Sequence, residues 1–223
     1  MTNHWLDLKN AKVILIEGSN AAENHPMSMK WVMRAKENGA TVIHVDPRYT
    51  RTSKVADIFA QIRPGTDIAF LNSIINYILQ NKLYDEEFII DHTNALFLLR
   101  DDFSFNEGLF SGYNEKEFKY DTGSWAYVED EAGYPVKGES LEDPRTVFSH
   151  MKEFFKRYDF KTASSITGIP EDTIKLIADT YINNRPGTIM YALGMTQHTV
   201  GVQNIRCFGV LQLLLGNVGK PGA

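Results

Sequence analysis

Cysteine is nearly absent from this sequence, since Cys207 is the only one among 223 residues. A single cysteine excludes a disulfide within the chain, and it excludes a zinc or iron–sulfur site built on cysteine ligands. Cys207 lies in the apolar stretch Arg206–Leu211. This setting predicts a small buried hydrophobic side chain.

Long apolar runs and excess positive charge are also missing. The stretches near Ile68–Leu79 and Val210–Leu215 are too short and too interrupted to cross a membrane, so no direct membrane insertion is expected. Met1–Trp5 is polar and lacks the apolar core of a signal peptide, which leaves the compartment open. The net charge of -5 gives no general attraction to nucleic acid.

What is present is an alternation of strand and helix patterns. A β-branched run that ends at Gly18 predicts a buried parallel strand, and a second such run follows a helix that Gly39 stops. Strand, polar turn, helix and strand are expected at Lys12–Glu17, Gly18–Pro26, Met27–Asn38 and Thr41–Val45. This order predicts a βαβ unit with a right-handed crossover.

Later elements extend this pattern on either side of an irregular segment. Strands are expected at Asp57–Ile62, as an edge strand, and at Gly187–Leu193. Helices are expected at Asp67–Gln80 (capped by Thr66 or Asp67), Asp85–His92, Arg145–Tyr158, Glu171–Asn183 and Val200–Leu215, with a loop at Ser164–Pro170. The residues from 100 to about 145 are rich in glycine, acidic and aromatic residues, which indicates a functional or interface insertion. The expected fold class is α/β, a Rossmann-like parallel sheet with helices on both faces and an irregular insertion.

The first polar turn stands where open α/β sheets bind ligands, at the carboxyl end of a strand. Gly18 permits tight turning, and the free N–H groups and helix dipole that follow suit a phosphate. Asn20 and Glu23 can hydrogen-bond a ligand or brace the loop. His25 either bonds a phosphate oxygen or is a pre-proline residue bonded to backbone.

The end of the second strand carries further candidate ligand residues. Asp46 stands where an acidic group commonly accepts from ribose hydroxyls, or it forms a local Asp-Pro turn. Arg48 and Arg51 add positive charge beside an anion site. Asp67, just after Gly65, is either a helix cap or a carboxylate that pairs with the N–H edge of guanine.

Several well-known motifs are missing. There is no Gly-x-Gly-x-x-Gly fingerprint, no Walker A lysine loop, no serine elbow and no metal cluster. The acidic pairs Asp101-Asp102 and Glu129–Glu131 are interpreted as solvated turns. A nicotinamide- or thiamine-diphosphate-binding domain of related form is the weakest alternative, because its fingerprint or metal–diphosphate motif is absent.

Five ordered motifs and the insertion resemble one family. The motifs are Gly18–Pro26, Val45–Thr52, Arg63–Asp67, Tyr191–His198 and Leu215–Gly222. Together they resemble the catalytic subunit of molybdopterin-dependent oxidoreductases, most closely the large subunit of membrane-associated formate dehydrogenases. Arg100–Tyr113 and Ser124–Tyr127 in the insertion are similar to that subgroup in particular. The resemblance covers essentially the whole chain, as the central cofactor-binding domain, 1–223, of a larger subunit.

The resemblance implies a molybdopterin guanine dinucleotide as cofactor, with molybdenum or tungsten in the complete subunit. It places pyrophosphate and ribose contacts at Ser19, Asn20, Glu23 and His25. It places guanosine contacts at Asp46, Arg48, Thr50, Gly65 and Asp67. It places further cofactor contacts in the second turn, at Gly194, Thr196, Gln197 and His198, and in a last contact segment, at Asn217 and Gly219.

The resemblance also implies what lies elsewhere. In the family, an iron–sulfur segment and a selenocysteine or cysteine metal ligand precede the part matched by Met1–Trp5, and the active-site arginine follows the part matched by Pro221–Ala223. We therefore expect no catalytic residue and no activity in this chain alone. The implied partners are the rest of the subunit, an iron–sulfur electron-transfer subunit and formate. The alternative is a free-standing module that binds a guanine nucleotide or the molybdopterin cofactor.

Overall fold

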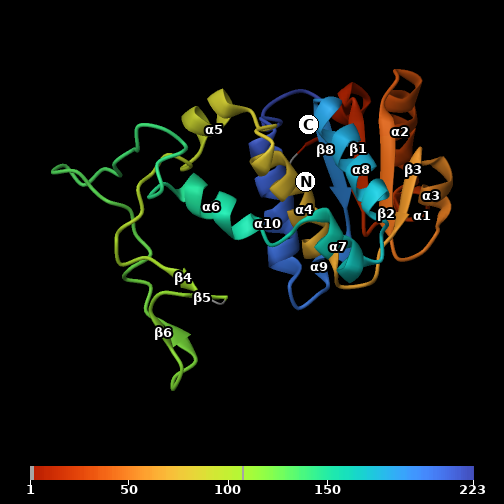
Figure 1. The fold of residues 1–223 in the computed structure, drawn as a ribbon. Coiled ribbons are helices and arrows are strands. Elements are labelled where there is room, and N and C mark those ends of the chain that lie inside the picture. The colour runs from red at the N-terminus through yellow and green to blue at the C-terminus, as the bar shows by residue number, and fades with distance from the viewer. Residues whose placement is uncertain (1–2, 107) are drawn as a thin grey trace. The chain divides into compact units, whose positions relative to one another are not determined.

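A four-stranded parallel sheet forms the centre of the larger of two compact units (Figure 1). The computed structural model describes residues 3–106 and 108–223. Unit 1 runs to Glu86 and resumes at Phe155, and unit 2 spans Glu87–Phe154. The sheet has the order β3-β2-β1-β8, with β1 (Val13–Glu17), β2 (Thr41–Asp46), β3 (Ile58–Gln61) and β8 (Gly187–Tyr191). All three pairings are parallel, so the predicted fold class and the edge position of β3 are confirmed.

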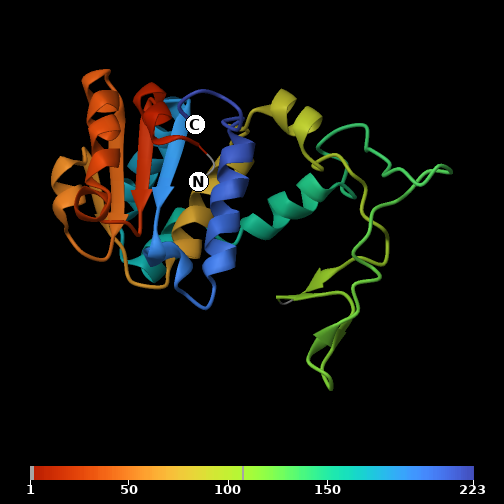
Figure 2. The same cartoon turned by 180° about the vertical axis from the view of Figure 1, so that it is seen from behind.

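Helices cover both faces of this sheet, as the two opposite views show (Figures 1 and 2). Every residue of β1 is buried, and its side chains alternate between the faces. Ile14 and Ile16 pack in one core with the helix α2 (Pro26–Glu37) and the 3₁₀ helix η1 (Trp5–Asn10). Val13 points to the other face, where a side chain at Gly187 would meet both Val13 and Tyr181 of α8 (Glu171–Asn183). Burial on both faces explains the unbroken apolar run of this strand.

The remaining helices of unit 1 include one that replaces an expected loop. The long helices α4 (Asp67–Gln80) and α10 (Gly201–Leu214) pack on each other, and α4 also packs on α7 (Phe160–Thr167). The loop predicted at Ser164–Pro170 is therefore wrong over Ser164–Thr167, which belong to α7, and right over Gly168–Pro170. Asp159 caps α7 by accepting the Thr162 amide at 2.6 Å, and Gly168 ends it with φ 78°. Asp159 and Gly168 are residue types that commonly cap the two ends of a helix, but the polar composition of the segment pointed to a loop instead.

Short helical turns were also not expected. They are η1, α1 (Ala21–Asn24), α3 (Arg51–Val55) and α9 (Leu193–Thr196). Segments of one turn are too short to show a helical period in the sequence. Of the two expected caps of α4, Thr66 occupies the N-cap position, but its side chain makes no cap hydrogen bond, and its hydroxyl donates to the Arg63 carbonyl at 2.7 Å.

Unit 2 contains the expected irregular segment, held by small hairpins and aromatic contacts. It includes all but the first residue of α5 (Glu86–His92) and all but the last residue of α6 (Val147–Phe155). It also includes the strand pairs β4 (Phe105–Asn106) with β5 (Leu109–Phe110) and β6 (Tyr113–Asn114) with β7 (Lys119–Tyr120). The Trp125 ring lies 5.2 Å from the rings of both Phe110 and Tyr120. The unit is longer than the predicted 100–145, because Leu98 and Leu99 form bridges with Thr146 and Tyr127. Among the described residues, no helix is long and apolar enough to cross a membrane.

Candidate functional site

The two predicted turns meet at the carboxyl ends of β1 and β8. The chain connects β1 to β2 on one side, while β8 pairs with β1 on the other, so this is a topological switch point. Gly18 follows β1 with φ 59°, and the Gly194 amide donates to the Gly18 carbonyl at 3.1 Å. A Cβ at Gly194 would lie 2.5 Å from that carbonyl oxygen. Only glycine therefore lets the two turns come this close.

A cavity of about 270 Å³ opens beside this contact. Seven of the predicted site residues line it, namely Gly18, Asp46, Arg48, Gly65, Asp67, Gly194 and His198. Val45, Pro47 and Pro64 complete the lining. The volume lies just below the roughly 300–1,000 Å³ of sites that enclose a whole small molecule, so it suits one part of a large ligand.

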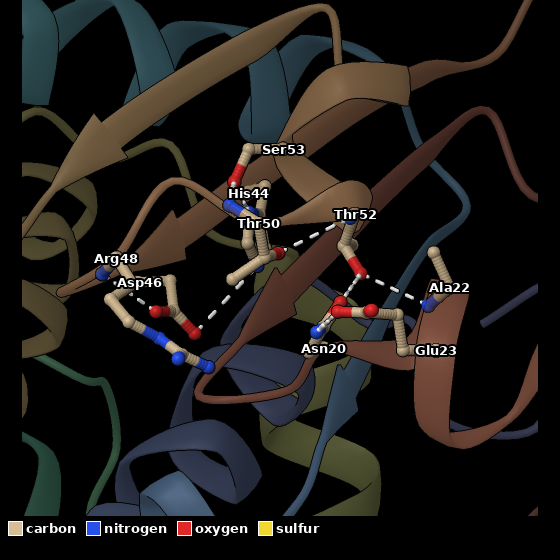
Figure 3. Close-up of polar contacts among 9 residues, drawn as sticks. All are labelled: Asn20, Ala22, Glu23, His44, Asp46, Arg48, Thr50, Thr52 and Ser53. Atoms are coloured by element: carbon tan, nitrogen blue, oxygen red, sulfur yellow. Dashed lines mark hydrogen bonds and ion pairs between the residues drawn. The ribbon is translucent and has the colours of Figure 1, made fainter.

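The first turn is braced by side chains of α3 (Figure 3). Thr52, fully buried, accepts the Ala22 amide at 3.0 Å and donates to Asn20 Oδ1 at 3.0 Å. The Asn20 amide in turn donates to the Glu23 carboxylate. Glu23 Oε1 also lies 3.5 Å from Arg51 Nε. The bracing alternative for Asn20 and Glu23 is thus realised, and it fixes the turn against α3.

The end of β2 is a tight polar turn. Asp46 Oδ1 accepts the Arg48 amide at 2.8 Å, and Oδ2 lies 3.9 Å from Nε2 of the buried His44 (Figure 3). The local-turn alternative for Asp46 is therefore present, and Asp46 also lines the cavity. Thr50 caps α3 by accepting the Thr52 amide at 3.2 Å.

Asp67 is the first residue of α4 and only 7% exposed. Burial raises the pKa of its carboxyl, whereas its own backbone amide and His198 lower that pKa, and Asp46 raises it. The positive end of the α4 dipole also favours the carboxylate. A carboxyl thus faces the cavity between a helix N-terminus and a histidine, and it can accept paired N–H groups of a ligand.

Other predicted residues lie around this centre. Ser19 is buried in the first turn, while His25 is exposed, with its ring 5.9 Å from that of Trp5. Thr196 ends α9, and Gln197 follows it, both with exposed side chains. None of these four residues lines the cavity, and three of them are exposed.

Asn217 and Gly219 are not brought to this cavity. The Asn217 side chain is fully buried, accepts the Gly187 amide at 3.4 Å and donates to Gln212 at 2.8 Å. Gly187 begins β8, so this contact lies at the amino edge of the sheet. The structure therefore separates this last motif from the others.

Three buried polar residues next to the site escaped the sequence reasoning: Glu17, His44 and Ser53. Both Glu17 carboxylate oxygens lack a hydrogen-bond partner within the described residues. Burial raises the pKa of Glu17 well above its ordinary value, and Asp67 adds to that rise. A charged or polar residue inside an apolar strand run was the available signal for Glu17 and His44.

Cys207 differs from the expected apolar core residue. It is half-buried, and its thiol donates to Asn72 Oδ1 at 3.2 Å. Burial raises its pKa to about 11, with Glu17 adding to the rise. The thiol therefore stays protonated at neutral pH and inert as a nucleophile. No group of three metal-binding side chains occurs in residues 3–106 and 108–223.

Comparisons with known proteins cover the whole of this chain. The family model described as "Molybdopterin oxidoreductase" matches residues 1–223. The formate dehydrogenase subunit alpha of Megalodesulfovibrio gigas is 54% identical over all of this chain, which spans 22% of that protein. The nitrate-inducible formate dehydrogenase major subunit of Escherichia coli is 49% identical, again over all of this chain and 22% of its own length.

A solved structure supports the fold. The acetylene hydratase from Pelobacter acetylenicus aligns with a TM-score of 0.66 over 98% of this chain and 25% of that chain, at 20% identity. At this identity the likeness concerns the fold alone. The chain thus spans about a fifth to a quarter of the proteins it matches.

Proposed function

Since the chain belongs to the molybdopterin oxidoreductase family, we propose that it is the part of a formate dehydrogenase alpha subunit that binds a molybdopterin guanine dinucleotide. The 54% identity with the Megalodesulfovibrio gigas alpha subunit over the whole chain carries the proposal. Formate is then the substrate of the complete enzyme. When bound, the cofactor supplies a molybdenum or tungsten centre that accepts electrons from formate.

The residues at the carboxyl edge fit the guanosine end of this cofactor. The cavity has room for a base and ribose. Asp46 would accept from the ribose hydroxyls, and Arg48 would neutralise phosphate charge. Ser19, Asn20, Glu23 and His25 would line the pyrophosphate, and Thr50, Thr196 and Gln197 would complete the surface.

Asp67 would select guanine. A carboxylate accepts two parallel hydrogen bonds from the N1–H and exocyclic N2–H groups of guanine, whereas the corresponding edge of adenine offers an acceptor at N1. Gly65, with φ 78° and open space around it, would let the base approach the backbone. His198, on the same cavity wall, favours the ionised state of Asp67.

We further propose that unit 2 contacts an iron–sulfur electron-transfer subunit. Its hairpins expose Leu109, Phe110, Tyr120 and Trp125, each to between 37% and 43%. Clustered aromatic side chains are characteristic of protein interfaces. Leu109→Asp should weaken binding of a purified iron–sulfur subunit in titration calorimetry, while Leu176→Asp on α8, also exposed, should not. Equal binding by both variants and the wild type would remove this assignment.

The cofactor proposal is tested with GDP as a probe of the guanosine end. Titration of the full 223-residue chain should show weak binding of GDP and weaker binding of ADP. Asp67→Asn keeps the size of the side chain but offers an amide to the guanine N–H edge, so the preference for GDP should fall by roughly tenfold. Asp102→Asn, an exposed aspartate in unit 2, is the matched control and should bind as the wild type does.

Two outcomes would count against this site. Equal affinity of the wild type for GDP and ADP would contradict guanine recognition. An unchanged preference in Asp67→Asn would leave guanine recognition standing but remove Asp67 from it.

A further inference from the structure

His44 is a buried polar residue inside the apolar strand β2. It is fully inaccessible to solvent, and its Nδ1 lies 2.8 Å from Ser53 Oγ. Its Nε2 has no hydrogen-bond partner in the described part of the chain and lies 3.9 Å from Asp46 Oδ2 (Figure 3). A buried unpaired nitrogen costs about 1–3 kcal/mol, so its presence beside a ligand-facing carboxylate requires an explanation.

Ser53 determines which nitrogen of the ring carries the proton. The Ser53 hydroxyl accepts the Thr50 amide at 2.8 Å and has one proton to donate. Among the described residues its only other hydrogen-bond partner is His44 Nδ1, at 2.8 Å, so a ring that accepts at Nδ1 gives that proton a partner. Burial lowers the pKa of His44, whereas Asp46 and the Ser19 backbone raise it. Burial has the larger effect, so a neutral ring is favoured. A neutral ring that accepts at Nδ1 carries its proton on Nε2.

The protonated Nε2 then lies near the Asp46 oxygen that Arg48 does not hold, and the Ser19 backbone also acts on this ring. The Arg48 amide binds Oδ1 at 2.8 Å, and Nε2 stands 3.9 Å from Oδ2. The second distance is too long for a hydrogen bond, so it is the N–H dipole that stabilises the charge. The carboxylate is therefore held by one hydrogen bond at Oδ1 and has the His44 ring near Oδ2 while it lines the cavity.

We propose that His44 and Ser53 are positioning residues that hold the Asp46 carboxylate in the orientation that receives ribose hydroxyls. The assignment rests on the proposed binding of a guanosine end at this cavity. It adds two residues that touch no ligand themselves. They act through Asp46, from β2 and from α3.

The first test needs no ligand. The ¹⁵N shifts of the imidazole nitrogens in the labelled full chain, assigned by loss of the signals in His44→Gln, should show a neutral ring protonated at Nε2. In Ser53→Ala the fixed tautomer should give way to a mixture. A wild-type ring protonated at Nδ1 would overturn the proposal.

The second test is GDP affinity. His44→Val, which suits a buried strand, should weaken binding by roughly three- to tenfold, an effect no larger than that of one neutral hydrogen bond. His44→Gln should restore most of the affinity, because its side-chain amide presents an N–H near the position of Nε2. Ser53→Ala should lie between them. Ser73→Ala removes another buried hydroxyl, which donates to the Phe70 carbonyl at 2.7 Å in α4, and should leave affinity unchanged.

A double-substitution cycle separates positioning from general damage. In an Asp46→Ala background, His44→Val should have no further effect on affinity. An equal loss with and without Asp46 would overturn the proposal. If the wild type showed no preference for guanine, the proposed function would be contradicted instead. The tautomer measurement, which needs no ligand, would then be the test of the His44 proposal.

Discussion

Buried polar side chains at the two edges of the parallel sheet differ in how fully they are hydrogen-bonded. At the amino edge, Asn217 bonds Gly187 and Gln212, and Gln212 also accepts from Tyr181 at 2.9 Å. At the carboxyl edge, Glu17 and His44 Nε2 are buried without hydrogen-bond partners among the described residues. Native proteins rarely leave buried polar atoms unpaired. The polar side chains of the amino edge therefore satisfy one another, and the unpaired groups at the carboxyl edge are consistent with the proposed binding site there.

The largest effect is expected from a substitution that breaks the contact between the two turns. Gly194→Ala would place a Cβ 2.5 Å from the Gly18 carbonyl oxygen and 2.7 Å from its Cα, where backbone must move. We expect a loss of about 3 kcal/mol in the free energy of unfolding, at the upper end for overpacking, together with loss of GDP binding. Urea unfolding and calorimetry measure the two effects.

Gly39→Ala is the control for this substitution. Gly39 has φ 88°, but no atom lies within 4 Å of the place that a Cβ would take, so only backbone strain of about 1–2 kcal/mol is expected. Its GDP affinity should match the wild type. If Gly194→Ala were as stable as the wild type and bound GDP normally, the close approach of the turns would not matter to the site.

The second-largest expected effect is a loss of stability on removing the Asn217 side chain at the amino edge. Asn217→Ala leaves the Gly187 amide without its side-chain acceptor and Gln212 without one donor, which should cost about 2 kcal/mol of stability. The GDP affinity of the folded variant should not change, because the contact lies at the other end of β8. A large loss of affinity at temperatures where the variant stays folded would show that the ligand site reaches Asn217.

Sequence reasoning worked best where many residues repeat one signal. The helix α8 was predicted with its observed bounds, and α4 and all four sheet strands lie within a few residues of expectation. The motifs around Gly18, Asp46, Asp67 and Gly194 converge on one cavity, as parallel strands require. Short helical turns such as α3 gave no periodic signal, so the hydrogen bonds that Thr52 and Ser53 make could not be predicted from the sequence. Pairing between distant residues, such as Asn217 with Gly187, depends on tertiary structure alone.

The smallest expected effect concerns Glu17 and follows from its raised pKa. Below the ordinary glutamate pKa of 4.5, the folded and unfolded chains both carry the protonated group. As the pH rises above that value, the unfolded chain ionises while the folded chain holds its proton, so the contribution of Glu17 to stability falls until the folded-state pKa is reached. Burial is the main cause, and the nearby Asp67 carboxylate adds to it.

Two variants separate the charge of Glu17 from its polarity. Glu17→Gln removes the ionisation and should flatten the fall in stability above pH 4.5 relative to the wild type, while Asp67, whose pKa burial also raises, remains in both. Glu17→Met also removes the unpaired polar atoms, so it should gain a further 1 kcal/mol or so at every pH. Thermal unfolding between pH 4 and pH 8 measures both changes. If Glu17→Met proved less stable than the wild type at pH 8, the Glu17 carboxyl would have a partner in solution. The carboxyl edge would then be as fully paired as the amino edge.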